Sequence, residues 1–375
     1  MQLLHATDYS VAQPTGHHDD APAKNGGRSW WSRWAARLVR RPSAPTDEPA
    51  AALDRPPVVP AQAAGVAAAT DLPTLVEGML EQGRYCLLLR PQITASLSTE
   101  QYGLARDALE RAMANVPAGL VDLSRRDAES SAEGETLRHV EPLMLDRYQV
   151  TNRQFRQFVV AGGYDVLPLW DAEVWPVLAE FVDLTGTAGP RFWRSGRYPS
   201  GEDDHPVVGI NWYEAVAYSR WVGKRLPTDS EWVKAAAWPV CLADNQVSQR
   251  RFPWGDVMDR GRCNVWGSGP GRTAAVTQFS TGVSVGGVYQ LIGNVWEWTS
   301  GDFDGVDAEG EPLDLPTMLK TIHGGAFDTY FEHQACCDFQ SGENPLSRKH
   351  NIGFRCALSR CDVGTAVVRT NPLTL

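Results

Sequence analysis

The sequence lacks several features that would assign it at once to a functional class. No Cys-x-x-Cys pair occurs among the seven cysteines of its 375 residues, so no zinc knuckle is recognisable. No run of 18 or more apolar residues is present, so no membrane span is predicted. The first residues hold no short basic stretch followed by an apolar one, which a secretory leader would need. We therefore expect a cytoplasmic protein whose thiols are mostly reduced.

Positive charge is also in short supply. The chain has 35 Lys and Arg against 45 Asp and Glu, and its net charge of −10 makes nucleic acid an unsuitable partner. Tryptophan and glycine are plentiful instead, at 14 and 34 residues. This combination favours a loop-rich fold whose irregular segments are held by large aromatic side chains, rather than a helical bundle.

Residues 1–70 have the composition of a disordered tail, because several prolines between positions 42 and 60 lie among alanines. A basic, Trp-rich segment at 28–41 interrupts this tail. On a helix, Trp30, Trp34 and Leu38 would share one face and arginines would occupy another. Such a segment can bind an anionic membrane surface or a groove on a protein partner. Binding to a membrane surface would make the protein peripheral to the membrane. The alternative is a solvated charge run.

A short helical segment is predicted over 72–120. Ser98 and Gln101 form a capping box, which begins a helix that the apolar pattern continues through Leu109 and Met113. From residue 140 the helical stretches become short, and long segments rich in Gly, Pro and Trp lie between them. Capping residues at Thr151 and Thr228 predict two of these short helices. The pattern indicates an α+β fold with little regular secondary structure.

Several local motifs follow one another in a specific order. They are Tyr148–Asn152, His205–Tyr218, Arg225–Trp232, Phe252–Asp256, Asn264–Trp266, Gly287–Thr299, Gly324–Gly325 and Asn351–Arg355. Any one of them is a weak signal, but the ordered series is highly specific.

This series resembles the formylglycine-generating enzyme, or sulfatase-modifying factor, superfamily over residues 140–360, with a C-terminal tail at 361–375. The resemblance implies an α+β domain related to the C-type lectin fold. Its members are functionally mixed: some are copper-dependent oxidases that make formylglycine, some belong to non-haem iron enzymes that join sulfur to a histidine derivative, and others only bind ligands. The fold therefore does not decide the function.

The resemblance allows the copper site to be checked residue by residue. In the copper oxidases, two cysteines lie five and ten residues after the first glycine of the Gly-Gly pair. Counting from Gly324, this chain has Thr329 and Gln334 at those places. Neither side chain is a soft ligand for Cu(I), so formylglycine generation is not expected.

A replacement set of catalytic or metal-binding residues is conceivable nearby. Cys336 and Cys337 follow His333 closely and could bind copper, iron or zinc. The candidate catalytic residues are therefore Cys337, Cys336, His333, Asp328 and Tyr330. Because neighbouring side chains on a strand point apart, we expect one of the two cysteines to pack in the core instead.

The iron-dependent relatives provide a second check, since their histidines come from an N-terminal bundle with the spacing His-x-x-x-His-x-Glu. Residues 1–140 contain only His5, His17, His18 and His139, and none of them fits that spacing. This class is disfavoured unless a partner chain supplies the ligands.

The segment after Gly-Gly, where the family builds its pocket, mixes aromatic and polar residues. A few polar groups among aromatic rings suit a small-molecule or peptide ligand. The expected substrate pocket consists of Thr329, Gln340, Glu343, Arg348 and His350.

The resemblance also implies a structural calcium site, formed by Gln290, Gly293, Val295 and Glu297. All four can present oxygen to a hard cation.

Two hypotheses of different classes remain. The first is a copper- or iron-dependent oxidoreductase that acts on a peptide side chain or small metabolite through altered ligands. The second is a non-catalytic module that binds a ligand or a protein. A bound redox metal would favour the first, and a tight ligand without one would favour the second.

Overall fold

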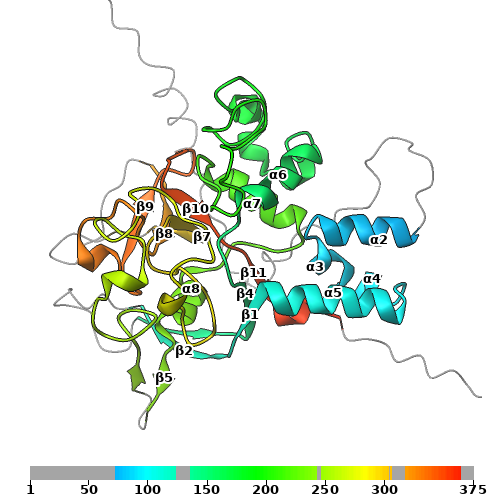
Figure 1. Ribbon diagram of the computed structural model, residues 1–375. Coiled ribbons are helices and arrows are strands. Elements are labelled where there is room, and N and C mark those ends of the chain that lie inside the picture. Colours follow the sequence, from blue (N-terminus) through cyan, green and yellow to red (C-terminus); the bar gives the residue numbers. More distant parts are fainter. Residues whose placement is uncertain (1–71, 124–135, 243–245, 304, 306–316, 365–375) are drawn as a thin grey trace, which may run out of the picture. The chain divides into compact units, whose positions relative to one another are not determined.

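The structure is a computed structural model that describes residues 72–123, 136–242, 246–303, 305 and 317–364 (Figure 1). The expected tail at 1–70, its segment at 28–41 and most of the expected tail at 361–375 lie outside these residues. Within the described part, no helix is long and apolar enough to cross a membrane.

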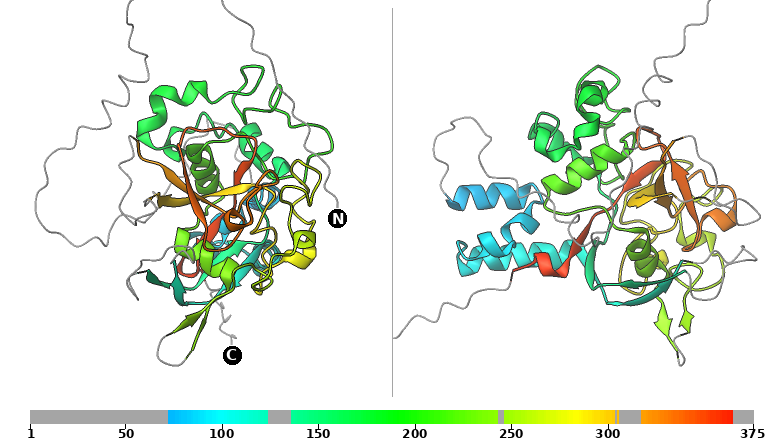
Figure 2. Two further views of the ribbon diagram at one scale, coloured as in Figure 1. Left: turned by 90° about the vertical axis from the view of Figure 1, so that its left-hand side faces the viewer. Right: turned by 180° about the vertical axis from the view of Figure 1, so that it is seen from behind.

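The first described elements form the predicted helical segment. Its helices are α2 (Leu72–Glu81), α3 (Tyr85–Leu88), α4 (Pro91–Thr94) and α5 (Thr99–Ala112). Both hydrogen bonds of the predicted capping box are present, at 3.0 Å and 3.1 Å between Ser98 and Gln101. The four helices lie together on one side of the first strands (Figures 1 and 2). The helical prediction is thus confirmed up to Ala112.

At Met113 the prediction is wrong, because this residue begins a strand rather than continuing the helix. Strand β1 (Met113–Val116) pairs antiparallel with β4 (Leu143–Asp146), which also pairs with β11 (Ala357–Ser359). Met113 and Ala114 are both buried by this pairing. The boundary near residue 140 therefore lies too late, since β1 already belongs to a sheet of the main domain.

The remaining strands form three further sheets. Strands β10 (Ile352–Phe354), β7 (Trp296–Asp302), β8 (Lys320–His323) and β9 (Gln340–Glu343) lie side by side in that order. The two others are the ribbons β2 (Gly119–Asp122) with β3 (Leu137–Val140) and β5 (Val240–Cys241) with β6 (Val247–Ser248). In the four-stranded sheet, β7 and β10 are parallel and the other pairs are antiparallel.

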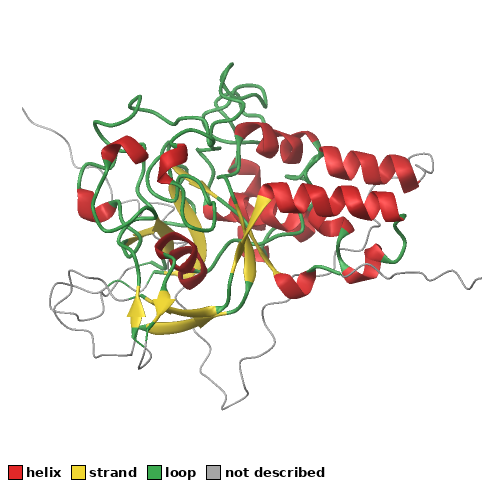
Figure 3. Ribbon diagram, turned by 60° about the horizontal axis from the view of Figure 1, so that its bottom comes forward, coloured by secondary structure: helices red, strands yellow, loops and turns green. Residues whose placement is uncertain are grey.

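Three short helices are set among long loops (Figure 3). They are α6 (Asn152–Val160), α7 (Trp212–Trp221) and α8 (Asp229–Ala237). A capping box begins each one, at Thr151, Asn211 and Thr228. Since side chains satisfy the free N–H groups at these helix starts, helices of only two to three turns are possible. The capping predictions at Thr151 and Thr228 are confirmed.

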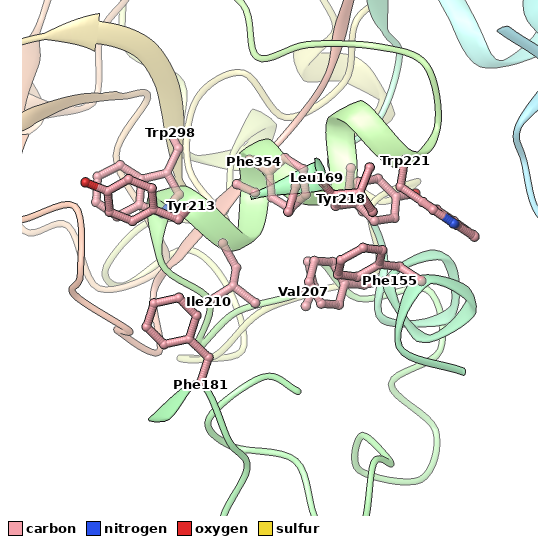
Figure 4. Packing of buried hydrophobic residues seen from close by; sticks show 14 of the residues in the cluster. Phe155, Leu169, Phe181, Val207, Ile210, Tyr213, Tyr218, Trp221, Trp298 and Phe354 are labelled. Atoms are coloured by element: carbon pink, nitrogen blue, oxygen red, sulfur yellow. The ribbon is translucent and has the colours of Figure 1, made fainter. Parts of the chain in front are cut away.

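Aromatic rings hold helices α6 and α7 to the four-stranded sheet. Phe155 of α6 stacks on Tyr218 of α7 with ring centroids 5.3 Å apart, and Tyr218 meets Phe354 of β10 edge to face at 5.5 Å (Figure 4). All three rings are buried. Such pairs stabilise by about 0.5–1.5 kcal/mol each beyond the burial of their area. This explains why a chain with so many aromatics needs little regular secondary structure.

A buried polar cluster connects the helical segment to the main domain. The Nζ atom of Lys224 donates to Asp146 at 2.6 Å and to the hydroxyl of Tyr85 in α3 at 2.8 Å. The main chain of Cys356 donates to the second oxygen of Asp146 at 3.0 Å. Burial alone would lower the pKa of Lys224, but Asp146 holds it well above its ordinary value. The lysine therefore stays charged, and the helical segment is an integral part of the domain.

The centre of the domain is a second buried cluster around Glu297 of β7. Arg355, which follows β10, binds its carboxylate through Nε and Nη2, each at 2.7 Å. The indole of Trp232 in α8 and the amide of Gln149 donate to the same carboxylate at 2.8 Å and 2.9 Å. Each oxygen of Glu297 thus accepts two hydrogen bonds, which compensates for the burial of its charge.

Replacing Arg355 with Met should therefore destabilise the protein strongly, because Glu297 would remain buried without its counter-ion. We expect a loss of about 3–5 kcal/mol in the free energy of unfolding, measured by urea titration. The matched control is Glu110→Ala, which breaks the exposed pair with Arg106 in α5 and should cost less than about 1 kcal/mol. Equal effects of the two substitutions would contradict the central role of this cluster.

Candidate functional site

The Gly-Gly pair ends β8 and turns the chain into the segment that carries most of the predicted site residues. Gly324 and Gly325 have φ values of +93° and +75°, which residues with side chains rarely adopt. A Cβ atom on Gly324 would also lie 2.4 Å from the carbonyl oxygen of Leu291. Both positions consequently require glycine, and the turn fixes where the following loop begins.

Thr329, at the first of the two cysteine places, stabilises this loop. Its hydroxyl accepts a hydrogen bond from the main chain of Ala326 at 2.8 Å, and its own N–H donates back to the carbonyl of Ala326 at 2.9 Å. The side chain is buried. Gln334, at the second place, ends a short 3₁₀ helix (Glu332–Gln334). Neither residue supplies sulfur, and the hydroxyl of Thr329 is already used within the turn.

Cys336 and Cys337 are buried side chains and do not form a metal centre with His333 in the structure. Cys336 is buried, and its thiol donates to the carbonyl of His333 at 2.9 Å. Burial, and then the charge of Asp338, raise the pKa of Cys336 to about 12. Cys337 is buried in a core cluster that includes Ala335 and Trp232. One of the two cysteines was expected in the core, and both are buried.

His333 lies on the outside of the same loop, so the proposed Cys/His cluster does not assemble. Within the described ranges, no group of three or more His, Cys, Asp or Glu side chains is arranged to hold a metal ion. Cys336 and Cys337 are buried, whereas His333 is exposed. The replacement ligand set predicted around Cys336 and Cys337 is therefore not supported.

The loop instead displays aromatic rings. Tyr330 and Phe331 are 63% and 55% exposed, and Trp266 beside them is 56% exposed. Ring centroids are 6.3 Å apart between Trp266 and Tyr330, and 5.2 Å apart between Tyr330 and Phe331. Phe331 stacks on His333 at 5.5 Å, and His333 meets Phe339 at 6.0 Å. We name these five residues the aromatic surface.

Asp328 and His350 are brought together at the same loop, as predicted members of the site. The carboxylate of Asp328 accepts two hydrogen bonds of 3.1 Å from the amide of Asn351. Its Oδ2 atom lies 3.5 Å from Nε2 of His350, and the imidazole is mostly exposed. The ring of His350 also packs edge to face on Phe327, which is buried. This polar pair can accept a proton or a hydrogen bond from a ligand.

Arg348 was expected in the pocket, and this expectation is wrong. Its guanidinium is buried and forms an ion pair with Glu214, with Nε 3.0 Å from Oε2. It also donates to the carbonyls of Val182 and Gly189 at 2.8 Å and 2.5 Å. Because buried Glu214 needs a counter-ion, Arg348 acts in folding rather than in ligand binding.

The two other predicted pocket residues lie on β9. Gln340 begins the strand opposite His323, and Glu343 ends it opposite Lys320. Glu343 accepts a hydrogen bond from Ser347 at 2.6 Å and pairs with Lys349. Both residues are half-buried at the edge of the four-stranded sheet. Of this pair, Gln340 is the nearer in sequence to the aromatic surface, because it follows Phe339.

Three residues of the aromatic surface, Trp266, Phe331 and Phe339, were not among the site residues predicted from the sequence. Trp266 belongs to the motif Asn264–Trp266, but no local pattern indicates that its main chain donates to the carbonyl of Thr329 at 3.2 Å. Phe339 also packs against Trp296 of β7 at 6.0 Å. Both placements depend on contacts between segments far apart in the sequence.

The residues expected to bind calcium do not fit that role. Both oxygens of Glu297 are saturated by Arg355, Trp232 and Gln149. The side-chain oxygen of Gln290 accepts from Asn294 at 2.5 Å. The carbonyl of Gly293 accepts from the main chain of Val295 at 3.0 Å. Since these oxygens are already bonded, a calcium site here is not supported.

Comparison with known proteins agrees with this architecture. The family described as the sulfatase-modifying factor enzyme 1-like domain matches residues 102–360. The chain is 30% identical over 302 residues to the formylglycine-generating enzyme of Thermomonospora curvata, covering 66% of this chain and 94% of that protein. It is 31% identical over 263 residues to the inactive C-alpha-formylglycine-generating enzyme 2 of Bos taurus, covering 62% and 81%.

A hercynine oxygenase of Mycolicibacterium smegmatis is 38% identical over 164 residues, covering 42% of this chain and 36% of that protein. The chain belongs to the sulfatase-modifying factor family. The predicted superfamily and its α+β fold are thereby confirmed.

Because Cys336 is buried, we expect its thiol to react slowly with alkylating reagents. In native protein at about pH 8, iodoacetamide should modify the exposed Cys241 and Cys361 and spare Cys336, because the thiolate is the reacting form. Mass spectrometry of tryptic peptides would measure the sites, and the same reaction in urea provides the control. Modification of native Cys336 as fast as Cys361 would instead indicate a reactive, accessible cysteine.

Proposed function

We propose that this protein is a ligand-binding member of its family, which binds a small molecule or a peptide at the aromatic surface and does not generate formylglycine. The observation that carries the proposal is the loop after Gly324–Gly325. Where two thiols would be needed, Thr329 closes a turn, and the residues that follow it place rings in solvent.

The exposed rings support binding because their contact with water is energetically unfavourable, and a ligand would remove it. Three large aromatic side chains in mutual contact leave apolar area in water, and contiguous patches of this kind typically mark interaction sites. Tyrosine and tryptophan are also the residues that contribute most energy at binding interfaces. The fixed turn at Thr329 keeps the rings in place, which lowers the entropy lost on binding.

An oxidoreductase remains the second candidate. Its support is the names of the relatives, which include formylglycine-generating enzymes and a hercynine oxygenase. The pair Asp328 and His350 at the same loop provides groups that can exchange protons with a substrate. Copper or iron would supply the oxidation, and its ligands would have to come from outside the set of thiols predicted here. The family also includes a relative described as inactive.

The binding proposal is tested by screening for ligands of the wild type and then measuring their affinity for matched variants. A displayed library of random heptapeptides and a set of fluorinated fragments observed by ¹⁹F NMR would be the probes. Ligands of the wild type should bind the double variant Tyr330→Ser/Phe331→Ser about tenfold more weakly or worse, because two anchoring rings are lost. The control is Trp175→Ser, which removes another ring that is about half exposed.

Equal binding to wild type and double variant, or no ligand from either screen, would contradict the proposal. The oxidoreductase alternative is tested on the same preparation with copper, oxygen and a cysteine-containing peptide. The binding proposal expects the mass of the peptide to stay unchanged. Conversion of its cysteine would instead establish the enzyme.

A further inference from the structure

His323, the last residue of β8, has both ring nitrogens next to hydrogen-bond acceptors. Its Nδ1 lies 3.1 Å from the carbonyl oxygen of Phe339, and its Nε2 lies 3.2 Å from Oδ1 of Asp229. The side chain is only 2% exposed, so water does not substitute for either partner. A carbonyl and a carboxylate can only accept, whereas a neutral imidazole donates from one nitrogen alone. Both hydrogen bonds can form together only when each ring nitrogen carries a proton.

The ring lies against an anion and an aromatic face. Asp229 is the first residue of α8, where the helix dipole stabilises an anion. Burial would raise the pKa of Asp229, but hydrogen bonds from His323 and Thr299 lower it below its ordinary value, so it is a carboxylate. The imidazole also stacks on the indole of Trp232 at 4.8 Å and 18°, an arrangement that attracts a cation.

The other charged groups around the ring are largely neutralised. Glu297 is opposite His323 in the β7–β8 ladder, but its carboxylate is paired with Arg355. From the side of β9, Phe339 and Gln340 are uncharged, and Asp338 precedes them in the chain. Asp229 is thus the anion that directly faces the imidazole.

The hydrogen bond to Phe339 connects His323 to the aromatic surface. It fixes the residue immediately before β9, whose ring packs between Trp296 and His333. His333 in turn stacks on Phe331. His323 is therefore connected through Phe339 and His333 to Phe331 of the aromatic surface.

We propose that His323 is a proton-dependent positioning residue for the aromatic surface. When the imidazolium loses a proton, one of its two hydrogen bonds is lost. Since the carboxylate of Asp229 holds the remaining proton more strongly, the bond to Phe339 is the one released. Ligand binding is then strong at low pH and weakens as the pH rises. The inference rests on the proposed binding function, and it adds a form of regulation to it.

The first test is NMR on the full chain, without any ligand. With ¹⁵N-labelled histidine, both ring nitrogens of His323 should carry protons at about pH 5.5, and one should lose its proton as the pH rises. The main-chain amides of Phe339 and Gln340 should shift with the same midpoint. A His323 ring that is neutral at about pH 5.5, or amides that ignore its titration, would overturn the proposal.

The second test measures binding of the neutral dye N-phenyl-1-naphthylamine between about pH 5.5 and about pH 8.5. Wild-type affinity should fall about tenfold, the effect expected from losing one hydrogen bond to a charged group. His323→Arg keeps a permanent charge and should bind tightly throughout. His323→Gln should bind weakly throughout.

A pH dependence that persists in His323→Arg would belong to His333 or His350, and would overturn the proposal. Dye binding that survives Tyr330→Ser/Phe331→Ser would show that the dye does not report on the aromatic surface. In that case the proposed function loses support, while the ligand-free NMR test still decides whether His323 positions Phe339.

Discussion

The structure depends on the buried carboxylate of Glu297. It accepts hydrogen bonds from Gln149, Trp232 and Arg355, and so joins β7 to the loop after β4, to α8 and to the end of β10. The burial of a charge is costly unless it is compensated, so the four hydrogen bonds act as a unit that specifies one arrangement.

A short series of hydrogen bonds connects this cluster to the candidate site. Gln149 also accepts from Asn294 at 3.0 Å, and the carbonyl of Asn294 accepts from the main chain of Phe327 at 3.1 Å. Gly293, beside Asn294, donates to the carbonyl of Gly324 at 2.9 Å. The Gly-Gly turn is therefore held by the centre of the domain. The same frame can carry different side chains on this loop, which is why family membership does not decide chemistry.

Much of the fold could be predicted because its signals are local. The capping boxes at Ser98, Thr151 and Thr228 need only residues three apart, and each one begins a helix in the structure. The ordered motifs identified the family for the same reason. Met113 was misassigned because the helical pattern continues through it, whereas its pairing with Asp146 of β4 decides its conformation. A tertiary contact of this kind cannot be recognised from the neighbouring residues in the sequence.

The site was only partly predictable. The structure brings Asp328 and His350 together, while Tyr330 of the same loop contacts Trp266 and Phe331. Arg348 was misplaced, since nothing near it in sequence reveals that Glu214 lies buried and needs a counter-ion. Glu297 was predicted to bind calcium because it has carboxylate oxygens. Those oxygens accept four hydrogen bonds from segments far away in the sequence. Sequence identifies which groups are available, while their partners in space decide which of them are free to act.

The central claim is that the loop after Gly324–Gly325 is a binding surface and not a copper site. The most direct test is competition for Cu(I) against a chromophoric chelator, with Cys336→Ser and Thr329→Ser as variants. The account predicts that the wild type takes no stoichiometric Cu(I) from the chelator and that neither variant differs from it. Tight, stoichiometric Cu(I) binding that disappears in Cys336→Ser would contradict the account and establish a thiolate copper centre.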